Sequence, residues 1–327
     1  MKERKLFHIV LKIFLAAVYV LISHDSFSQG MYTQFGQNRV QYGNFEWSYV
    51  RTENFDGFFY SGGRELGTFA VRNAEEQLNG IEKLIDHRLS GRVEIICYNS
   101  LSDYKQANFG IYQSTANIGG YTQVVNNKIF IYFNGNHDHF LRQIKSGVAL
   151  VLINEIIFGG TIQERLQNAA LLNLADWQLF GLTSYLGKDW DVENDNRMKD
   201  IILNKKFKKF NRLAQTDQVL AGHSFWRFLV EKYGTEVIAN MVYVTRLSRN
   251  FESALNYVTG YDLNQTLKDW LKFYQEQYAK EELNRSMTGI DFKIKKRLRP
   301  YVEPQMKVSP KGDYVAFTTN NSGKYKV

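Results

Sequence analysis

The distribution of proline is the strongest constraint on how this chain of 327 residues can fold. The sequence contains three prolines, and all of them lie between positions 300 and 310. Proline breaks helices and the central strands of sheets, so the proline-free part can hold long uninterrupted elements. We therefore expect a main domain over residues 29–287, a linker over residues 288–308 and a different element from residue 309 onward.

The first 28 residues have the layout of a cleavable secretory signal. Basic residues precede the apolar stretch Ile13–Ile22, and the small residues Ser26 and Ser28 follow it. That stretch is about half of the ~20 residues that a membrane-spanning helix needs. We expect cleavage after Ser28 and an exported mature protein, and no later segment of the sequence is apolar enough to span a membrane.

Between residues 45 and 133 the sequence alternates between strand and helix patterns. Runs rich in β-branched and aromatic residues predict strands over residues 45–50, 55–60, 92–98 and 128–133. Apolar residues recur every three or four positions over residues 65–88, which predicts a helix packed on these strands.

The rest of the main domain has a helical pattern. Asp138 can cap a long helix that runs to Phe158 and ends before Gly159. Further helices are predicted over residues 171–186, 217–233, 236–247, 251–258 and 262–283. In the last of these, Asp262 and Gln265 form a predicted capping box. A small mixed sheet with a packed helix, followed by a helical bundle, is an α+β architecture.

Two helical stretches, Ile144–Leu150 and Trp177–Tyr185, follow the predicted strand at residues 128–133. In this order they resemble the gluzincin, or thermolysin-like, metallopeptidases, and most closely the peptidase-MA-like domains of exported bacterial proteins. In that family the first helix reads Ile-x-His-Glu-x-x-His and the second reads Trp-x-x-Glu-Gly-Leu-Ala-Glu-Tyr. The stretch Ala221–Gly234 resembles a further helix of the family, and the similarity covers residues 47–278.

The residues that would hold and use zinc are missing from these stretches. Such a site needs two histidines at i and i+4, a neighbouring glutamate as base, and a carboxylate from the second helix. The corresponding positions hold Ser146 and Leu150 for the histidines, Gly147 for the base and Phe180 for the carboxylate. We therefore expect a degenerate peptidase domain with no catalytic residue, no zinc and no other cofactor.

The histidines leave one alternative open, which is a zinc metallopeptidase with unusual ligands. His137 and His139 lie two residues apart, and Glu155 lies farther along the same predicted helix. Two histidines in a short turn can bind a metal ion weakly, although such a pair more often starts a helix. His87 and His223 stand alone in helical runs and are expected to be packed or hydrogen-bonded side chains.

Three other features have simple interpretations. The segment Asp189–Asp195 lacks the glycine and glutamate of an EF-hand loop, so we expect a solvated acidic loop rather than a calcium site. The net charge of +8 is concentrated in residues 205–212 and 293–299. We expect these to be solvated faces with no nucleic-acid partner, and polyanion binding is a minor alternative. Cys97, flanked by β-branched residues, is expected to be buried.

After the prolines, Ser309-Pro310-Lys311-Gly312 predicts a tight turn and residues 313–318 predict a strand. With Asn321-Ser322-Gly323, this segment resembles the start of a blade in TolB-like β-propellers. One and a half strands bury almost no apolar surface by themselves. We therefore expect residues 309–327 to be the first part of a truncated propeller.

These features together predict a non-catalytic protein of the bacterial cell envelope, in the periplasm or at the outer membrane or surface of a Gram-negative cell. It would act as a scaffold or bind a peptide or protein partner. A sheet edge holds extended peptides through backbone hydrogen bonds without a metal ion, and residues 112–133 are expected to supply that edge. Alternatively, Leu150 and Phe180 pack together and close the cleft.

Overall fold

The computed structural model describes residues 43–107, 123–125, 127–159, 174–207, 209–283, 306–321 and 324–326. The chain divides into two compact units, Met1–Tyr278 and Ala279–Val327. The predicted signal over residues 1–28 and the basic run over residues 293–299 lie outside the described residues. No helix of the described part is both long and apolar enough to cross a membrane.

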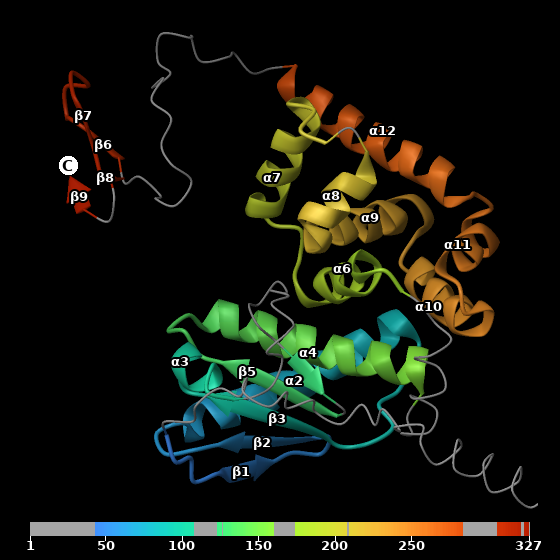
Figure 1. Cartoon of the computed structure of the whole chain (residues 1–327). Coiled ribbons are helices and arrows are strands. Elements are labelled where there is room, and N and C mark those ends of the chain that lie inside the picture. The colour runs from blue at the N-terminus through green and yellow to red at the C-terminus, as the bar shows by residue number, and fades with distance from the viewer. Residues whose placement is uncertain are drawn as a thin grey trace, which may run out of the picture. The chain divides into compact units, whose positions relative to one another are not determined.

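The first unit begins with a five-stranded sheet in the order β1-β2-β3-β5-β4 (Figure 1). β1 (Ser48–Arg51) is antiparallel to β2 (Phe55–Phe59), while β3 (Val93–Tyr98) lies parallel to β2 and to β5 (Lys128–Tyr132). β4 (Gln123–Val125) pairs with β5 in the antiparallel direction. The four predicted strands are confirmed, and the sheet is mixed as expected.

The two faces of the sheet differ in their side chains because successive residues of a strand point to opposite sides. The helix-covered face carries aliphatic side chains and the cysteine, namely Val93, Ile95, Cys97, Ile129 and Ile131. The opposite face belongs to a second cluster that includes Ile96, Tyr98, Phe130 and Tyr132. Cys97 is fully buried, as predicted.

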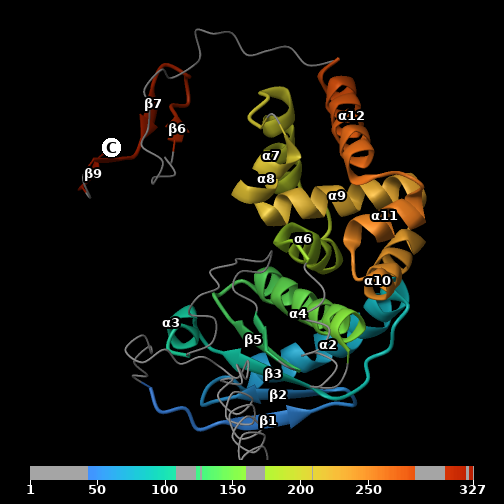
Figure 2. The same ribbon diagram turned by 45° about the vertical axis from the view of Figure 1, so that its right-hand side comes forward.

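Two long helices cover the aliphatic face (Figures 1 and 2). α2 (Arg64–Ile85) packs on β1, β2 and β3, and α4 (His137–Phe158) packs on β4, β5 and α2. A short helix, α3 (Leu101–Tyr104), contributes Tyr104 to the cluster on the other face. The cap of α4 is Asn136, whose side chain accepts a hydrogen bond from the backbone N–H of His139, so the predicted cap at Asp138 was wrong by two residues.

The remaining helices form a bundle beside α4 (Figure 2). They are α6 (Asp176–Gly187), α7 (Val192–Leu203), α8 (Phe210–Thr216), α9 (Gln218–Tyr233), α10 (Glu236–Ser248), α11 (Phe251–Thr259) and α12 (Leu263–Glu282). α6 contacts both α4 and α9, and α10 contacts α2, α4 and α11. The expected α+β class, with a small mixed sheet followed by helices, is confirmed; α7 and α8 were not predicted.

The helix ends show which local signals the chain uses. Asp217 caps α9 by accepting a hydrogen bond from Leu220 N–H. Asp262 accepts one from Gln265 N–H at 2.7 Å, but the Gln265 side chain donates to Asp269. The predicted capping box is therefore only half formed, because the carboxylate of Asp269 one turn further on attracts the glutamine amide.

The second unit contains two short antiparallel strand pairs. β6 (Met306–Val308) pairs with β7 (Val315–Phe317), and β8 (Thr319–Asn321) pairs with β9 (Lys324–Lys326). Gly312 adopts a positive φ of 78° and donates its N–H to the Ser309 carbonyl. This hydrogen bond confirms the predicted turn, and glycine suits the position because it adopts positive φ readily.

Candidate functional site

The face of α4 that would carry the first zinc-binding histidine is closed by α6. Ser146 is fully buried, and its hydroxyl has no hydrogen-bond partner among the described residues. Gly187 of α6 lies directly against it. A Cβ added to Gly187 would come within 2.1 Å of Ser146 Oγ and 3.1 Å of Ser146 Cα. The two helices therefore leave no space between these residues for a larger side chain.

The other three motif positions are occupied by groups that cannot bind a metal ion. Gly147 and Leu150 are buried in α4, and Phe180 in α6 is half-buried. Aliphatic and aromatic side chains carry no nitrogen, oxygen or sulfur donor for zinc. Neither Leu150 nor Phe180 belongs to the two hydrophobic clusters of the described residues, so their mutual packing stays a prediction.

The two histidines at the start of α4 point to different sides of the helix. The His137 ring lies against Phe69 and Phe133, with centroid distances of 5.3 and 5.0 Å. His139 lies instead beside Tyr132. Burial lowers the pKa of His139, and the nearby positive charge of Arg142 lowers it further. The pair does not form a bidentate site, because residues two apart on a helix face away from each other.

Glu155 lies near the opposite end of α4, ~24 Å from His139 at 1.5 Å per residue. It is buried, and its Oε2 accepts a hydrogen bond from Ser90 N–H at 3.1 Å. The same oxygen lies 3.5 Å from His87 Nε2. The structure therefore does not bring together His137, His139 and Glu155, the ligands of the alternative metallopeptidase.

Metal-binding residue types do not cluster elsewhere in the described part of the chain. No group of three or more His, Cys, Asp or Glu side chains there could hold a metal ion. The absence of zinc and of any other cofactor stays a prediction from the sequence.

A buried polar pair joins α6 to α9: His223 is packed and hydrogen-bonded as predicted, but its partner Ser184 was not predicted. The Ser184 hydroxyl lies 2.6 Å from His223 Nδ1, and both residues are almost completely buried. Burial, together with the positive charges of Lys188 and Arg227, lowers the pKa of His223 to about 3, and Asp191 partly opposes this shift. A serine next to a histidine is the beginning of a nucleophilic arrangement. Here the serine has no exposed surface for a substrate to approach, so the pair is a structural hydrogen bond.

The acidic segment Asp189–Asp195 is only partly a solvated loop: Asp189 is exposed ahead of α7, whereas the residues from Val192 onward belong to that helix, which corrects the prediction for this part. Asp191 caps α7 through Asn194 N–H and holds Lys188 Nζ at 2.5 Å. Asp195 accepts hydrogen bonds from Trp190 Nε1 at 2.9 Å and from Tyr278 OH at 3.0 Å. The carboxylates alternate because the segment starts a helix, where acidic side chains cap N–H groups and meet the positive end of the helix dipole.

Arg227 in α9 lies between aromatic side chains near the α6–α9 contact. Its guanidinium lies 4.9 Å from the centroid of the Trp190 ring and 5.7 Å from that of Tyr274. Sequence spacing gave no sign of this arrangement, because the residues come from the loop before α7, from α9 and from α12. Only the packing of these three segments brings them together.

β4 is the strand at one edge of the described sheet, where the sequence predicted a peptide-binding edge. It pairs only with β5 among the described strands, so it ends the sheet on the side away from β1. Val124 packs against the main core, and β4 contacts α4. The expectation that residues 112–133 supply a sheet edge is met by residues 123–125, while residues 108–122 lie outside the described part.

No protein-family model matches the sequence, and no curated protein matches it.

Proposed function

We propose that residues 29–287 form a gluzincin-type domain without a zinc site, which acts as a non-catalytic scaffold or peptide- and protein-binding module of the bacterial cell envelope. The order of elements supports this proposal. A mixed sheet ends in the antiparallel strand β4, the long helix α4 lies beside it, and α6 crosses α4. These are the elements that the family resemblance implies, in the same order along the chain.

The contact between Gly187 and Ser146 carries the non-catalytic part of the proposal. A metallopeptidase needs a hollow in which two imidazoles, a carboxylate and a water molecule meet around zinc. Here the helix backbones approach so closely that a single methyl group on Gly187 would overlap Ser146 Oγ. A zinc site that was intact but empty would have space between α4 and α6 at these residues, and the close packing of Gly187 on Ser146 leaves none.

Metal content and hydrolysis test this part. The purified protein, stripped with EDTA and then incubated with zinc, is expected to retain no stoichiometric zinc by mass spectrometry and to leave casein uncut. One tightly held zinc ion per chain, or casein cleavage that EDTA abolishes, would contradict the proposal.

The position of β4 supports the binding part: among the described strands it pairs only with β5, and a strand edge without a neighbour offers backbone donors and acceptors to an extended peptide. Peptides selected on the protein from a random display library should slow hydrogen exchange in residues 123–132. If the selected peptides slow hydrogen exchange only in other elements, the edge of β4 is not the peptide-binding site.

The second unit extends the proposal to a propeller. The β6–β7 hairpin with its Ser309–Gly312 turn supports the resemblance to the opening of a TolB-like blade. If the reading frame continues beyond Val327, repeated Ser-Pro-x-Gly strands are expected there, and a continuation without them would argue against a propeller.

A further inference from the structure

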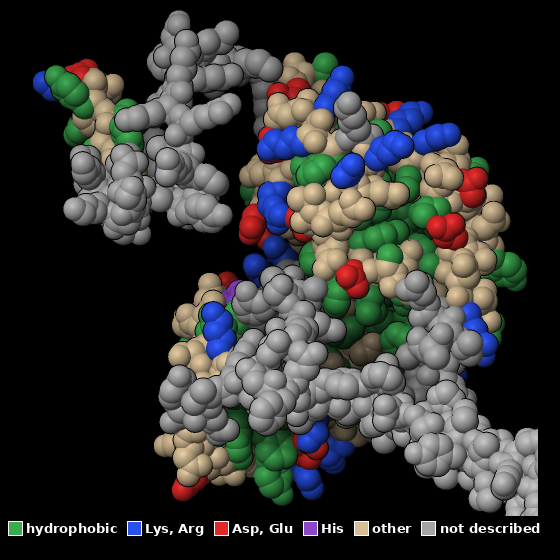
Figure 3. Space-filling view, in the orientation of Figure 1, with side chains coloured by type: hydrophobic (Ala, Val, Ile, Leu, Met, Phe, Trp, Pro, Cys, Tyr) green, Lys and Arg blue, Asp and Glu red, His purple; other side chains and the backbone are tan. Residues whose placement is uncertain are grey.

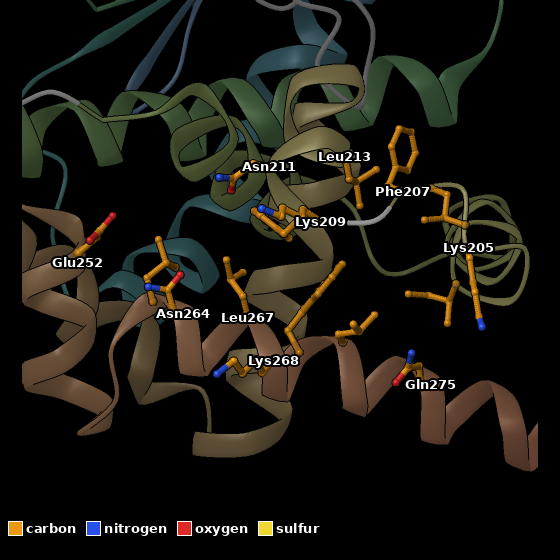
Figure 4. Close-up of a pocket in the computed structure, with 16 residues that line it drawn as sticks. Lys205, Phe207, Lys209, Asn211, Leu213, Glu252, Asn264, Leu267, Lys268 and Gln275 are labelled. Carbon is orange, nitrogen blue, oxygen red and sulfur yellow. The ribbon is translucent and has the colours of Figure 1, made fainter.

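A groove of about 910 Å³ lies between α12 and the residues around α8 (Figure 4). Its volume is within the range of ligand-binding clefts, which are commonly about 300–1,000 Å³. The lining residues that matter here are Leu263, Leu267, Leu271, Lys205, Lys209 and Lys268. The first three form an apolar row, and the last three are basic.

The apolar row lies along one side of α12. Leu263, Leu267 and Leu271 follow one another at intervals of four residues, over ~12 Å of helix. Leu263 and Leu267 are half-buried, and Leu271 is 39% exposed. Trp270 and Tyr274 lie on the same side of α12 and are buried in the bundle, and Leu263 and Leu267 pack against that core, so the row forms the exposed margin of the buried face. A row at four-residue spacing is the kind of ridge that packs against a second helix.

The basic residues of the groove are free to meet an anionic partner. Lys205, Lys209 and Lys268 are exposed, and none forms an ion pair with the described residues. Their neighbour Lys206, in contrast, pairs with Asp200. In the space-filling view, Lys and Arg side chains gather over α12 and the nearby helices, with hydrophobic side chains between them (Figure 3). Among the described residues that line the groove, Glu252 is the single acidic one.

The positions of the lysines distinguish an extended ligand from a small head group. Lys209 and Lys268 lie near the middle of the groove, whereas Lys205 lies toward one end and does not point at the other two (Figure 4). Glu252 lies at the opposite end. One carboxylate or phosphate group would need several cations converging on a single point. Spaced cations beside an apolar row instead match several acidic side chains along one polypeptide.

We propose that this groove binds an amphipathic helix of a partner protein, with apolar side chains on the leucine row and Asp or Glu side chains facing Lys205, Lys209 and Lys268. This is the helix-in-groove mode of recognition, in which apolar anchors at i, i+3 or i+4 and i+7 provide contact and flanking charges provide orientation. The surface is separate from the edge of β4, so the inference stands or fails independently of the proposed function.

A designed 18-residue helix tests the proposal. The fluorescent probe carries leucines at four-residue spacing and glutamates beside them, and its binding to the full chain is followed by fluorescence anisotropy. Two matched probes have lysines in place of the glutamates, or the same composition with the apolar stripe scrambled. We expect the glutamate helix to bind, and to bind more weakly as salt is added, while the other two bind at least tenfold more weakly.

Protein variants locate the binding to the groove. Replacing the three lysines by glutamate (Lys205→Glu, Lys209→Glu and Lys268→Glu) should weaken the glutamate helix roughly tenfold or more and favour the lysine helix. Leu271→Asp should also weaken it. The control Lys272→Glu lies on the same helix but outside the groove lining, and should change the affinity less than twofold. All positions are exposed, and circular dichroism melting checks that each variant folds.

Several results would overturn the proposal. One is an unchanged affinity of the glutamate helix for the triple variant, and another is an unchanged affinity for Leu271→Asp. A third is equal binding of the scrambled probe, which would indicate a basic surface that binds any polyanion. Oleate is added as a separate probe. If oleate binds in a lysine-dependent way and the glutamate helix does not, the groove belongs to a lipid-binding site and not to a protein interface.

Discussion

The imidazole of His223 in α9 lies 2.6 Å from the hydroxyl of Ser184 in α6, in a contact almost completely shielded from water. The hydrogen bond satisfies Nδ1, while Nε2 has no partner among the described residues. Protonation of this ring would place a positive charge near Lys188 and Arg227, with Asp191 as the opposing charge. The neutral imidazole therefore stabilises the contact between α6 and α9.

The first prediction concerns pH. An unfolded histidine has a pKa of about 6.5, and burial, together with the positive charges of Lys188 and Arg227, lowers that of His223 to about 3. Between these values the unfolded chain binds a proton that the folded chain does not, so the free energy of unfolding falls as the pH falls. The loss should be on the order of 4 kcal/mol between pH 7 and pH 3.

Urea unfolding across this pH range checks the prediction when the protein is compared with His223→Gln. The carboxylates titrate in both proteins, so the difference between the two curves isolates the histidine. Parallel curves would show that His223 does not contribute to the acid sensitivity.

The second prediction concerns the crossing of α6 and α9. A Cβ on Gly222 would lie 1.9 Å from the Trp177 carbonyl oxygen and 2.5 Å from Gly181 Cα. Gly222→Ala should lower the free energy of unfolding by about 1–3 kcal/mol, because both neighbours are backbone atoms that cannot rotate away.

The matched control is Gly80→Ala in α2, where an added Cβ meets nothing within 4 Å. This change should stabilise the protein by about 0.5–1 kcal/mol through helix propensity. Thermal denaturation of both variants should give shifts of opposite sign; a stabilised Gly222→Ala would mean that the helices are not so closely packed.

The third prediction concerns Ser146 and Leu150, the positions that the family resemblance aligns with zinc-binding histidines. The double change of Ser146→His with Leu150→His should not create peptidase activity, because the base and the third ligand are also missing. It should also destabilise the protein, since Gly187 leaves no room for an imidazole at position 146. Casein cleavage and thermal melting test both statements.

Ser146→Ala is the control for the same site. Its buried hydroxyl has no partner among the described residues, so removing it should be neutral or stabilise the fold by up to about 1 kcal/mol. Casein cleavage by the double variant would show that the site had kept its catalytic geometry.

The fourth prediction concerns Asp191, which both caps α7 and pairs with Lys188. Burial alone would raise the pKa of Asp191, but hydrogen bonds from Lys188 and from Asn194 N–H outweigh it and hold the pKa below its usual value. Asp191→Asn keeps a capping side chain and leaves the buried Lys188 unpaired, which should cost about 1–2 kcal/mol.

Asp191→Ala should cost about 1 kcal/mol more, because the cap is lost as well. The exposed neighbour Asp189, changed to alanine, should alter stability by less than about 0.5 kcal/mol. Chemical denaturation of the three variants gives the ranking, and equal stability of the Asn and Ala variants would exclude the capping role.

Local patterns predicted the elements well where periodicity and end signals agreed. The four strands and the helices α2, α4, α9, α10, α11 and α12 follow from apolar spacing, with Gly159 and Gly234 at two of the ends. The failure at α7 has a physical cause. Asp191 and Asp195, two of the acidic residues that suggested a solvated loop, are a helix cap and a hydrogen-bond acceptor, and sequence spacing does not distinguish these roles.

The sequence by itself determined the α+β class and the residue types on the face of α4, because side-chain chemistry and periodicity are local properties. Leu150 and Phe180 cannot bind zinc in any fold. Tertiary structure alone decided that Gly187 closes over Ser146, that Ser184 meets His223, and that Lys205 and Lys268 border one groove. Such contacts join residues tens of positions apart, and they depend on how the helices cross, which no pattern within a single helix specifies.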